Sequence, residues 1–251
     1  MQNVARSTNA TNASTKFVID LGQARSIGAL ALVVHNISSL GKVRWTGNTS
    51  NSFASPAYDS GWVDVWPTNI IPFSLRQWED ANFWTGQMSE EQRAGYQAPF
   101  IHQPAAAQYL RYWQCEIDDT TNAAGAVYIG RLFMAATWTA TVNYNYGATL
   151  GYDDPTPVIE SLSGAEYFDV RQKPRGFAFQ LEWLTSTEAY SNVMDLQRLS
   201  GISGEVLVVP DSDDTANMPI RAMVGRLRSL GKIAQPHLNS YSASFEIKEL
   251  L

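Results

Sequence analysis

The sequence predicts a mainly β chain with two domains, a β-sandwich followed by an α+β unit that contains one helix. Apolar and polar residues alternate along most of the chain, as they do in half-buried strands. Aromatic residues are abundant, with 8 Trp, 11 Tyr and 10 Phe among 251 residues, and such residues favour strands and contact surfaces. One strongly helical segment lies in the second half.

Strand-like segments dominate the first half, which we assign to a domain of residues 1–137. Phe17, Ile19 and Leu21 share one face of the first strand. The segment Ile27–His35 is apolar on both faces, as in a strand that is covered on both sides. Further strands are expected from Val43 onward and at Trp62–Trp66, Tyr109–Ile117 and Val127–Met134. The tryptophans expected in the core are Trp45, Trp62, Trp66 and Trp113.

A long insertion, residues 68–104, interrupts these strands. It contains prolines, aromatic residues and a short candidate helix at Ser89–Ala94, for which Ser89 is a suitable N-cap. Loops of this length inside a compact domain are usually functional or interfacial. An exposed aromatic side chain there can stack on a sugar or anchor a protein interface. The residues that we expect to make such contacts are Trp78, Phe83, Trp84 and Tyr96.

We assign residues 138–251 to a second domain with the order strand, helix, strand, strand, strand. Thr185 and Glu188 form a capping box at the start of the helix, and Gly201 supplies its stop. The residues expected on the buried face of the helix are Ala189, Val193, Leu196 and Leu199. The strand before it is expected to place Phe177, Phe179, Leu181 and Trp183 on one face. The later strands are expected at Val206–Val209, Ile220–Leu227 and Tyr241–Ile247.

No residue pattern predicts catalysis. Cys115, the only cysteine, alternates with apolar strand residues and is expected to be buried. The three histidines, His35, His102 and His237, lie far apart in the sequence. The cluster Asp211–Asp214 lacks the glycine and the distal glutamate of a calcium loop, so a solvated turn is expected. The same expectation applies to Asp118-Asp119 and to Asp153-Asp154. We therefore expect no enzyme activity, no cofactor and no metal, although sequence does not exclude a pair of distant carboxylates acting as a glycosidase site.

Charge and hydropathy exclude two further classes of protein. The net charge is −6 and no basic stripe occurs, which argues against specific binding of nucleic acid. The longest apolar run, Ile27–Val34, is too short to span a bilayer, and the polar N-terminal segment lacks the apolar core of a secretory signal. We expect neither membrane insertion nor secretion.

The first half resembles the discoidin or coagulation-factor C-type family, whose domains are galactose-binding-like jelly-roll sandwiches. The resemblance lies in Phe17-Val-Ile-Asp-Leu-Gly22, Ile27–Val34, Tyr109-Leu-Arg-Tyr112 and Ile129-Gly-Arg-Leu-Phe133, and in their order. It covers most of residues 15–135. Members of that family bind glycans or lipid head groups through loops at one end, and the insertion 68–104 departs from the family pattern.

The second half resembles distal tail and tail-tube proteins of long-tailed bacteriophages. The matching features are Tyr144-Asn-Tyr-Gly147, Gly151-Tyr-Asp-Asp154, Arg171–Arg175, the capped helix, Val208-Val-Pro-Asp211 and the terminal strand. Such proteins have a β-sandwich or split barrel flanked by one helix and build rings that join the tail tube to the tip. Many of them carry an accessory sandwich domain.

Together the two resemblances imply a structural protein of a phage tail tip. Its partners would be further copies of itself in a ring, with a hexamer favoured, and the tube, hub and tape-measure proteins. It would be assembled in the bacterial cytoplasm and reside in the virion tail. The alternative is a carbohydrate-binding module that adheres to a host-surface glycan, and a polysaccharide-degrading enzyme ranks last.

Overall fold

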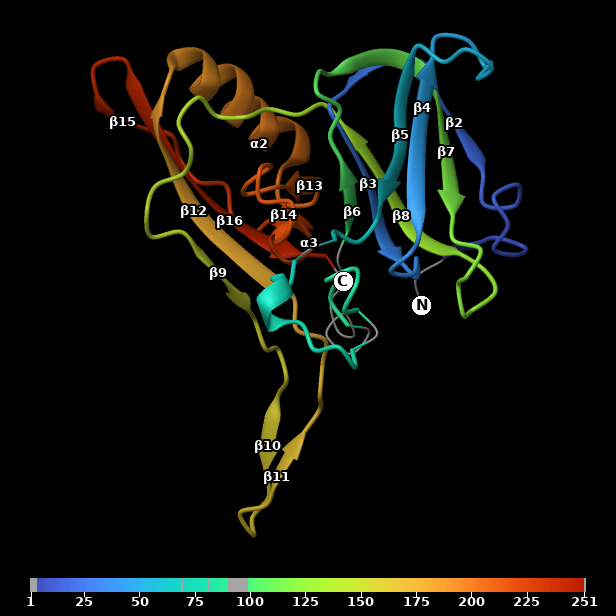
Figure 1. Cartoon of the computed structure of the whole chain (residues 1–251). Coiled ribbons are helices and arrows are strands. Elements are labelled where there is room, and N and C mark those ends of the chain that lie inside the picture. The colour runs from blue at the N-terminus through green and yellow to red at the C-terminus, as the bar shows by residue number, and fades with distance from the viewer. Residues whose placement is uncertain (1–3, 69, 81, 90–98, 251) are drawn as a thin grey trace. The chain divides into compact units, whose positions relative to one another are not determined.

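A computed structural model of the chain describes residues 4–68, 70–80, 82–89 and 99–250. The chain is mainly β, as predicted, with several antiparallel sheets (Figure 1). It divides into two compact units, Met1–Thr137 with Val209–Ala222, and Trp138–Val208 with Met223–Leu251. The segment 209–222, which sequence analysis placed in the second domain, therefore groups with the first unit. No helix formed by the described residues has the length and apolar character needed to cross a bilayer.

The first unit contains two four-stranded antiparallel sheets. One sheet has the order β1-β8-β3-β6 and the other the order β2-β7-β4-β5. The strands are β1 (Ala5–Arg6), β2 (Phe17–Ile27), β3 (Ala29–His35), β4 (Lys42–Asn48), β5 (Tyr58–Asp64), β6 (Phe100–His102), β7 (Gln108–Asp118) and β8 (Tyr128–Ala135). Strands that are neighbours in space are mostly distant in sequence, so the sheets form only when the whole unit folds.

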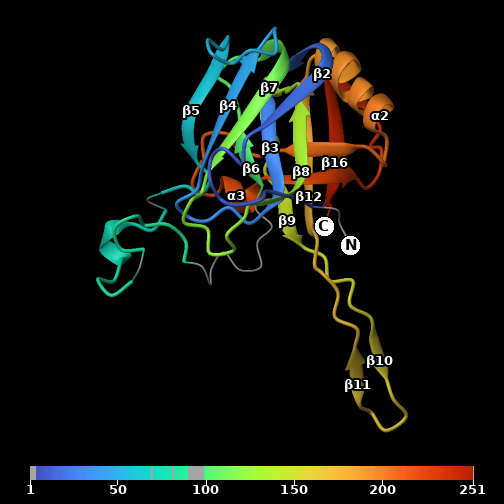
Figure 2. The same ribbon diagram turned by 90° about the vertical axis from the view of Figure 1, so that its right-hand side faces the viewer.

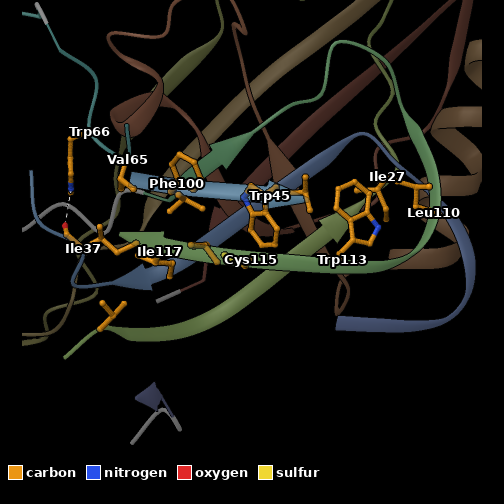
Figure 3. Packing of buried hydrophobic residues seen from close by; sticks show 14 residues of the cluster. Ile27, Ile37, Trp45, Val65, Trp66, Phe100, Leu110, Trp113, Cys115 and Ile117 are labelled. Atoms are coloured by element: carbon orange, nitrogen blue, oxygen red, sulfur yellow. Dashed lines mark hydrogen bonds between the residues drawn. The ribbon is translucent and has the colours of Figure 1, made fainter. Parts of the chain in front are cut away.

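An apolar core joins these two sheets, and its centre is aromatic (Figure 3). Trp45 of β4 and Trp113 of β7 have 0% of their surface exposed, and Cys115 beside them is equally buried. The predicted burial of these three residues is confirmed. The run Ala29–Val33 in β3 is buried at every position, which confirms a strand covered on both faces.

Two expectations about the first unit are wrong in detail. Trp62 in β5 is 41% exposed, so its predicted burial is wrong. Trp66 lies beyond the end of that strand but is buried in the core as predicted, and its Nε1 donates to the carbonyl of Ile37 at 3.0 Å (Figure 3). The insertion 68–104 is not one continuous connection between strands, because its last part contains β6. Phe100 of β6 is 4% exposed and pairs with Leu32, so burial in the core draws this short segment into the sheet.

The second unit contains an antiparallel sheet with the order β13-β14-β16-β12-β9, and β15 also pairs with β16. These strands are β9 (Thr149–Tyr152), β12 (Arg175–Leu184), β13 (Glu205–Val208), β14 (Met223–Leu227), β15 (Ala234–His237) and β16 (Ser240–Glu249). A separate hairpin consists of β10 (Val158–Glu160) and β11 (Glu166–Phe168). The strand predicted at Ile220–Leu227 starts later, at Met223. The residues before it form the short helix α3 (Met218–Arg221), which groups with the first unit and has Pro219 in its first turn, a position that proline suits.

The predicted capping box is confirmed at the start of the helical segment 186–200, which comprises η2 (Glu188–Val193) and α2 (Met194–Ser200). The Glu188 carboxylate accepts from the backbone N–H of Thr185 at 2.9 Å, and the Thr185 hydroxyl accepts from the N–H of Glu188 at 3.2 Å. Glu188 also accepts from the N–H of Thr141 at 2.8 Å. The hydrogen bonds from Thr141 and Thr185 lower the pKa of Glu188 to about 2. One carboxylate thus fixes both the helix start and the segment before β9.

The helix buries a narrower face than its sequence spacing predicts. Ala189 and Val193 are fully buried, and Leu196 packs partly against the same core. Leu199, however, is 74% exposed, so its predicted burial is wrong. The turns of η2 are wide, with π-type hydrogen bonds, which changes the angle between successive residues and carries Leu199 off the core face. The predicted stop at Gly201 is confirmed, with φ +53°.

A bulge in β12 overturns the alternation expected for its last residues. Phe177 and Leu181 are buried as predicted, but Trp183 is 58% exposed and the next residue, Leu184, is buried. Trp183 has φ +60°, and the pairing with β16 shifts register between Leu181 and Leu184. The extra residue reverses the inward and outward positions, as a β-bulge does.

We predict that Glu188→Gln lowers the free energy of unfolding by about 1–3 kcal/mol at pH 7, because two amide donors lose a charged acceptor. The folded-state pKa of Glu188 lies below its ordinary value of 4.5, so its stabilisation is complete above pH 4.5 and is lost as the pH falls toward 2. The variant should therefore lose less stability than wild type across that range.

Urea unfolding followed by circular dichroism at several pH values measures this difference. Glu182→Gln is a matched control, since the Glu182 carboxylate accepts only from the side chain of Gln180 among the hydrogen bonds of the described residues. Equal destabilisation by both variants would contradict the role given to Glu188.

Candidate functional site

The insertion folds into a closed lobe, residues 71–87, of which residue 81 lies outside the described residues. The N–H of Ile71 donates to the carbonyl of Gly86 at 3.0 Å and joins the two ends of the lobe. Between them, the 3-10 turn η1 (Phe73–Leu75) follows Pro72. The lobe is therefore a compact loop whose ends are joined, which suits a contact surface.

Arg76 holds the interior of the lobe. Its Nε donates to the carbonyl of Ile71 at 2.8 Å and its Nη1 to the carbonyl of Phe83 at 3.1 Å. Its guanidinium also lies 5.7 Å from the ring centre of Phe73, within the range of a cation–π contact. Gly86 has φ +59°, a conformation that favours glycine, and a Cβ there would lie 2.1 Å from the guanidinium of Arg76 and displace it.

Gln87 fastens the lobe to the rest of the first unit. It is 4% exposed, and its Nε2 donates to the carbonyls of Ser39 at 3.0 Å and Trp66 at 3.2 Å. Its own carbonyl accepts from the Asn82 side chain at 2.6 Å. The buried amide nitrogen of Gln87, with two carbonyl acceptors, holds the base of the lobe in place.

Four rings on the lobe form an aromatic cluster, made of Phe73, Trp78, Phe83 and Trp84. Phe83 is half-buried at its centre, with ring centres 5.3 Å from Phe73 and 5.1 Å from each tryptophan. Trp78 and Trp84 lie 5.7 Å apart and are 72% and 76% exposed. The cluster is thus ordered by its own ring contacts while it presents two indoles to solvent.

Of the four residues predicted to make contacts, the structure brings three together, Trp78, Phe83 and Trp84. The fourth, Tyr96, lies outside the described residues, as does most of the candidate helix Ser89–Ala94. Sequence reasoning missed Phe73, which completes the cluster, although an aromatic residue next to Pro72 in the same insertion was a usable signal.

The geometry of the cluster favours a protein contact over a flat sugar platform. The planes of Trp78 and Trp84 stand at 70° to each other, so the two indoles do not form one flat surface. A projecting group of this shape fits an apolar pocket, in the way that tryptophan anchors do at protein interfaces. The nearby carboxylates, Glu79 and Asp80, are exposed and take part in no ion pair with the described residues.

The other candidate groups serve the fold. Burial raises the pKa of the Cys115 thiol and lowers that of His35 to about 4. His102 bonds through Nε2 to the Tyr58 hydroxyl at 2.7 Å, and His237 stacks on Trp183 with ring centres 5.9 Å apart. The described residues bring no three metal-ligating side chains together.

The aspartate clusters act within their own loops. In the segment Asp211–Asp214, the Asp214 carboxylate accepts from the Asn217 side chain at 2.9 Å and from Arg221 at 2.8 Å. Asp119, expected in a solvated turn, is instead 2% exposed, and it accepts from the N–H of Ser38 at 2.9 Å. The expectation for Asp119 is wrong because a long-range contact buries it.

Comparisons with protein-family models and with curated protein sequences found no match.

We predict that Arg76→Ala disorders the aromatic cluster without unfolding the first unit, because it removes the hydrogen bonds to Ile71 and Phe83. The near-ultraviolet circular dichroism of the coupled indoles should weaken, while the unfolding free energy changes by less than about 1 kcal/mol, as expected for a surface lobe. Arg25→Ala serves as the control, and an unchanged spectrum in Arg76→Ala would contradict the assignment.

Proposed function

We propose that the chain is a structural protein of a phage tail tip, of the distal tail type, that assembles through homo-oligomeric contacts. The ring, with a hexamer favoured, would join the tail tube to the tip, with tube, hub and tape-measure proteins as partners. The protein would be built into virions in the bacterial cytoplasm. The observation that carries the assembly role is the aromatic cluster, and the phage context rests on the resemblance of the second half.

The strand order supports a jelly-roll identity for the first unit. In sheets ordered β1-β8-β3-β6 and β2-β7-β4-β5, early and late strands alternate, as in an eight-stranded sandwich built from two Greek keys. This agrees with the galactose-binding-like resemblance of the same residues. A fold of this kind serves many functions, so it supports the domain type and not a ligand.

The architecture of the second unit supports the tail-protein resemblance. One antiparallel sheet carries a single long helical segment against its core face, where Ala189 and Val193 pack with Phe177 and Ile247. A sheet flanked by one helix is what the resemblance implies.

The alternative function is recognition of a host-surface glycan. It is favoured by one observation, the high exposure of Trp78 and Trp84, since each indole separately offers a face on which a sugar can stack. The angle between the two indoles makes a protein partner the better fit.

Gold-labelled antibodies against the full chain test the proposal on phage particles produced from the genome that encodes it. We expect label at the tail end distal to the head. Label absent from intact particles and from detached tails would contradict a structural role in the virion.

Trp78→Ala with Trp84→Ala should lower incorporation of the protein into particles, because truncating anchor residues costs an interface about 2 kcal/mol or more, roughly a 30-fold loss of affinity. Particle-bound protein is measured by immunoblot, and Trp62→Ala, which removes a partly exposed tryptophan elsewhere, is the control. Normal incorporation combined with lost binding to a glycan array would favour the alternative function.

A further inference from the structure

A long β-hairpin extends from the sheet of the second unit, and we call residues 153–174 the arm (Figure 2). Its two sides are joined along their length: the N–H of Asp153 donates to the carbonyl of Pro174 at 2.9 Å, and Lys173 pairs with Asp154 at 3.0 Å. Beyond these contacts, β10 and β11 pair in register up to a turn at 161–165. The arm is therefore a continuous ribbon that prolongs β9 and β12.

A buried ion pair fixes the base of the arm. Arg175, the first residue of β12, is 4% exposed and Glu249, in the last position of β16, is 9% exposed. The Glu249 carboxylate accepts from the backbone N–H and from Nε of Arg175, each at 3.0 Å, and from Nη2. Because such a pair is held in one geometry by several hydrogen bonds, it sets the direction in which the ribbon leaves the sheet.

The arm exposes large apolar side chains on both faces. The exposed fractions are 54% for Val158, 65% for Ile159, 111% for Leu162, 64% for Tyr167, 58% for Phe168 and 78% for Val170. A two-stranded hairpin is marginally stable in water, and a monomeric protein rarely exposes so many apolar residues together. These residues mark a contact surface.

The arm also carries an uncompensated negative charge near its tip. Glu160 and Glu166 occupy directly opposed positions of β10 and β11, and like charges in such positions destabilise a hairpin. Neither carboxylate has an ion-pair partner among the described residues. A partner with two cations would relieve this repulsion.

A groove lies on the face of the main sheet opposite the helix, and we call it the sheet groove. Its volume is about 230 Å³, and its lining includes Thr149, Gly151, Gly176, Ala178, Arg228 and Lys248 together with the carboxylates of Asp153 and Glu246. Arg228 pairs with Glu246 at 2.8 Å and with Asp153 at 3.8 Å, so these three charges compensate one another. Small residues of β9 and β12 form the bottom of the groove. A Cβ atom at Gly151 would have no other atom within 4 Å. It is open to an inserted side chain.

Two cations lie beside this groove in directly opposed strand positions, as the two glutamates do on the arm. Arg226 of β14 is exposed and directly opposes the half-buried Lys248 of β16. On its other side Arg226 directly opposes Glu205 of β13, but within the described chain neither Arg226 nor Lys248 forms an ion pair. The pairing of like charges on the sheet thus matches the pairing of like charges on the arm, with opposite sign.

The arm of the same chain does not reach this groove. The groove adjoins the arm's base, since Gly176 follows Arg175 directly and Asp153 contributes to its wall. The ribbon leads away from the sheet, as both views show (Figures 1 and 2). An arm seated in this groove would therefore belong to a second molecule.

We propose that the arm of one copy docks in the sheet groove of a second copy. Leu162 at the tip enters over Gly151 and Gly176, while Glu160 and Glu166 meet Arg226 and Lys248. The two contacting surfaces differ, so each copy offers one arm and one groove, and repetition gives a closed ring or an open filament. This inference rests on the proposed function, because it names the contact through which the protein assembles.

Charge reversal tests the docking with the full chain. The arm variant Glu160→Lys/Glu166→Lys and the groove variant Arg226→Glu/Lys248→Glu should each weaken self-association by about tenfold or more in sedimentation velocity. An equal mixture of the two variants should associate again, because each arm then finds a groove of opposite charge. Combining all four substitutions in one chain should restore self-association.

Asp213→Lys, an exposed reversal outside both surfaces, is the control and should associate like wild type. Self-association of wild type that the arm and groove variants leave unchanged would overturn the inference, as would a wild-type chain that stays monomeric, or variants that the mixture fails to rescue. The gold-labelling result is independent of self-association, so the proposed function would survive such failures if tail tips are labelled.

Discussion

The buried pair of Arg175 and Glu249 is the interaction on which the second unit and its arm most depend. It joins the first residue of β12 to the end of β16, two strands at the centre of the sheet. A charge removed from water is tolerated only when its hydrogen bonds are made, and here the carboxylate accepts from the backbone as well as from the guanidinium. Removing either partner would leave the other charge buried without its partner, so the pair fixes the alignment of β12 with β16 and the direction of the arm together.

Each unit exposes a group of large apolar side chains, but the structures that carry them differ. In the first unit, the aromatic cluster sits on a lobe held by Arg76 and Gln87. In the second, the apolar residues line a ribbon that has no core of its own. Neither feature stabilises the free chain, since both leave large side chains in water. The proposed assembly role would account for both, because contacts with partners would remove this surface from water.

Local signals predicted much of the fold. The capping box of Thr185 and Glu188 and the stop at Gly201 were readable because each depends on residues a few positions apart. Alternation identified β16, and a run apolar on both faces identified β3, for the same reason. Two apolar pairs around a Ser-Gly turn at 161–164 also signalled the hairpin of the arm, but that signal was missed.

The sequence by itself determined the mainly β class, the core tryptophans Trp45 and Trp113 and the presence of exposed aromatics in the insertion. Only the tertiary structure decided that Trp183 faces outward, that Asp119 is buried and that Phe73 joins Trp78 and Trp84. The physical reason is the separation along the chain between the residues that interact. Periodicity and capping act between neighbours in the chain, whereas a bulge, a buried carboxylate and a ring cluster depend on contacts between distant segments.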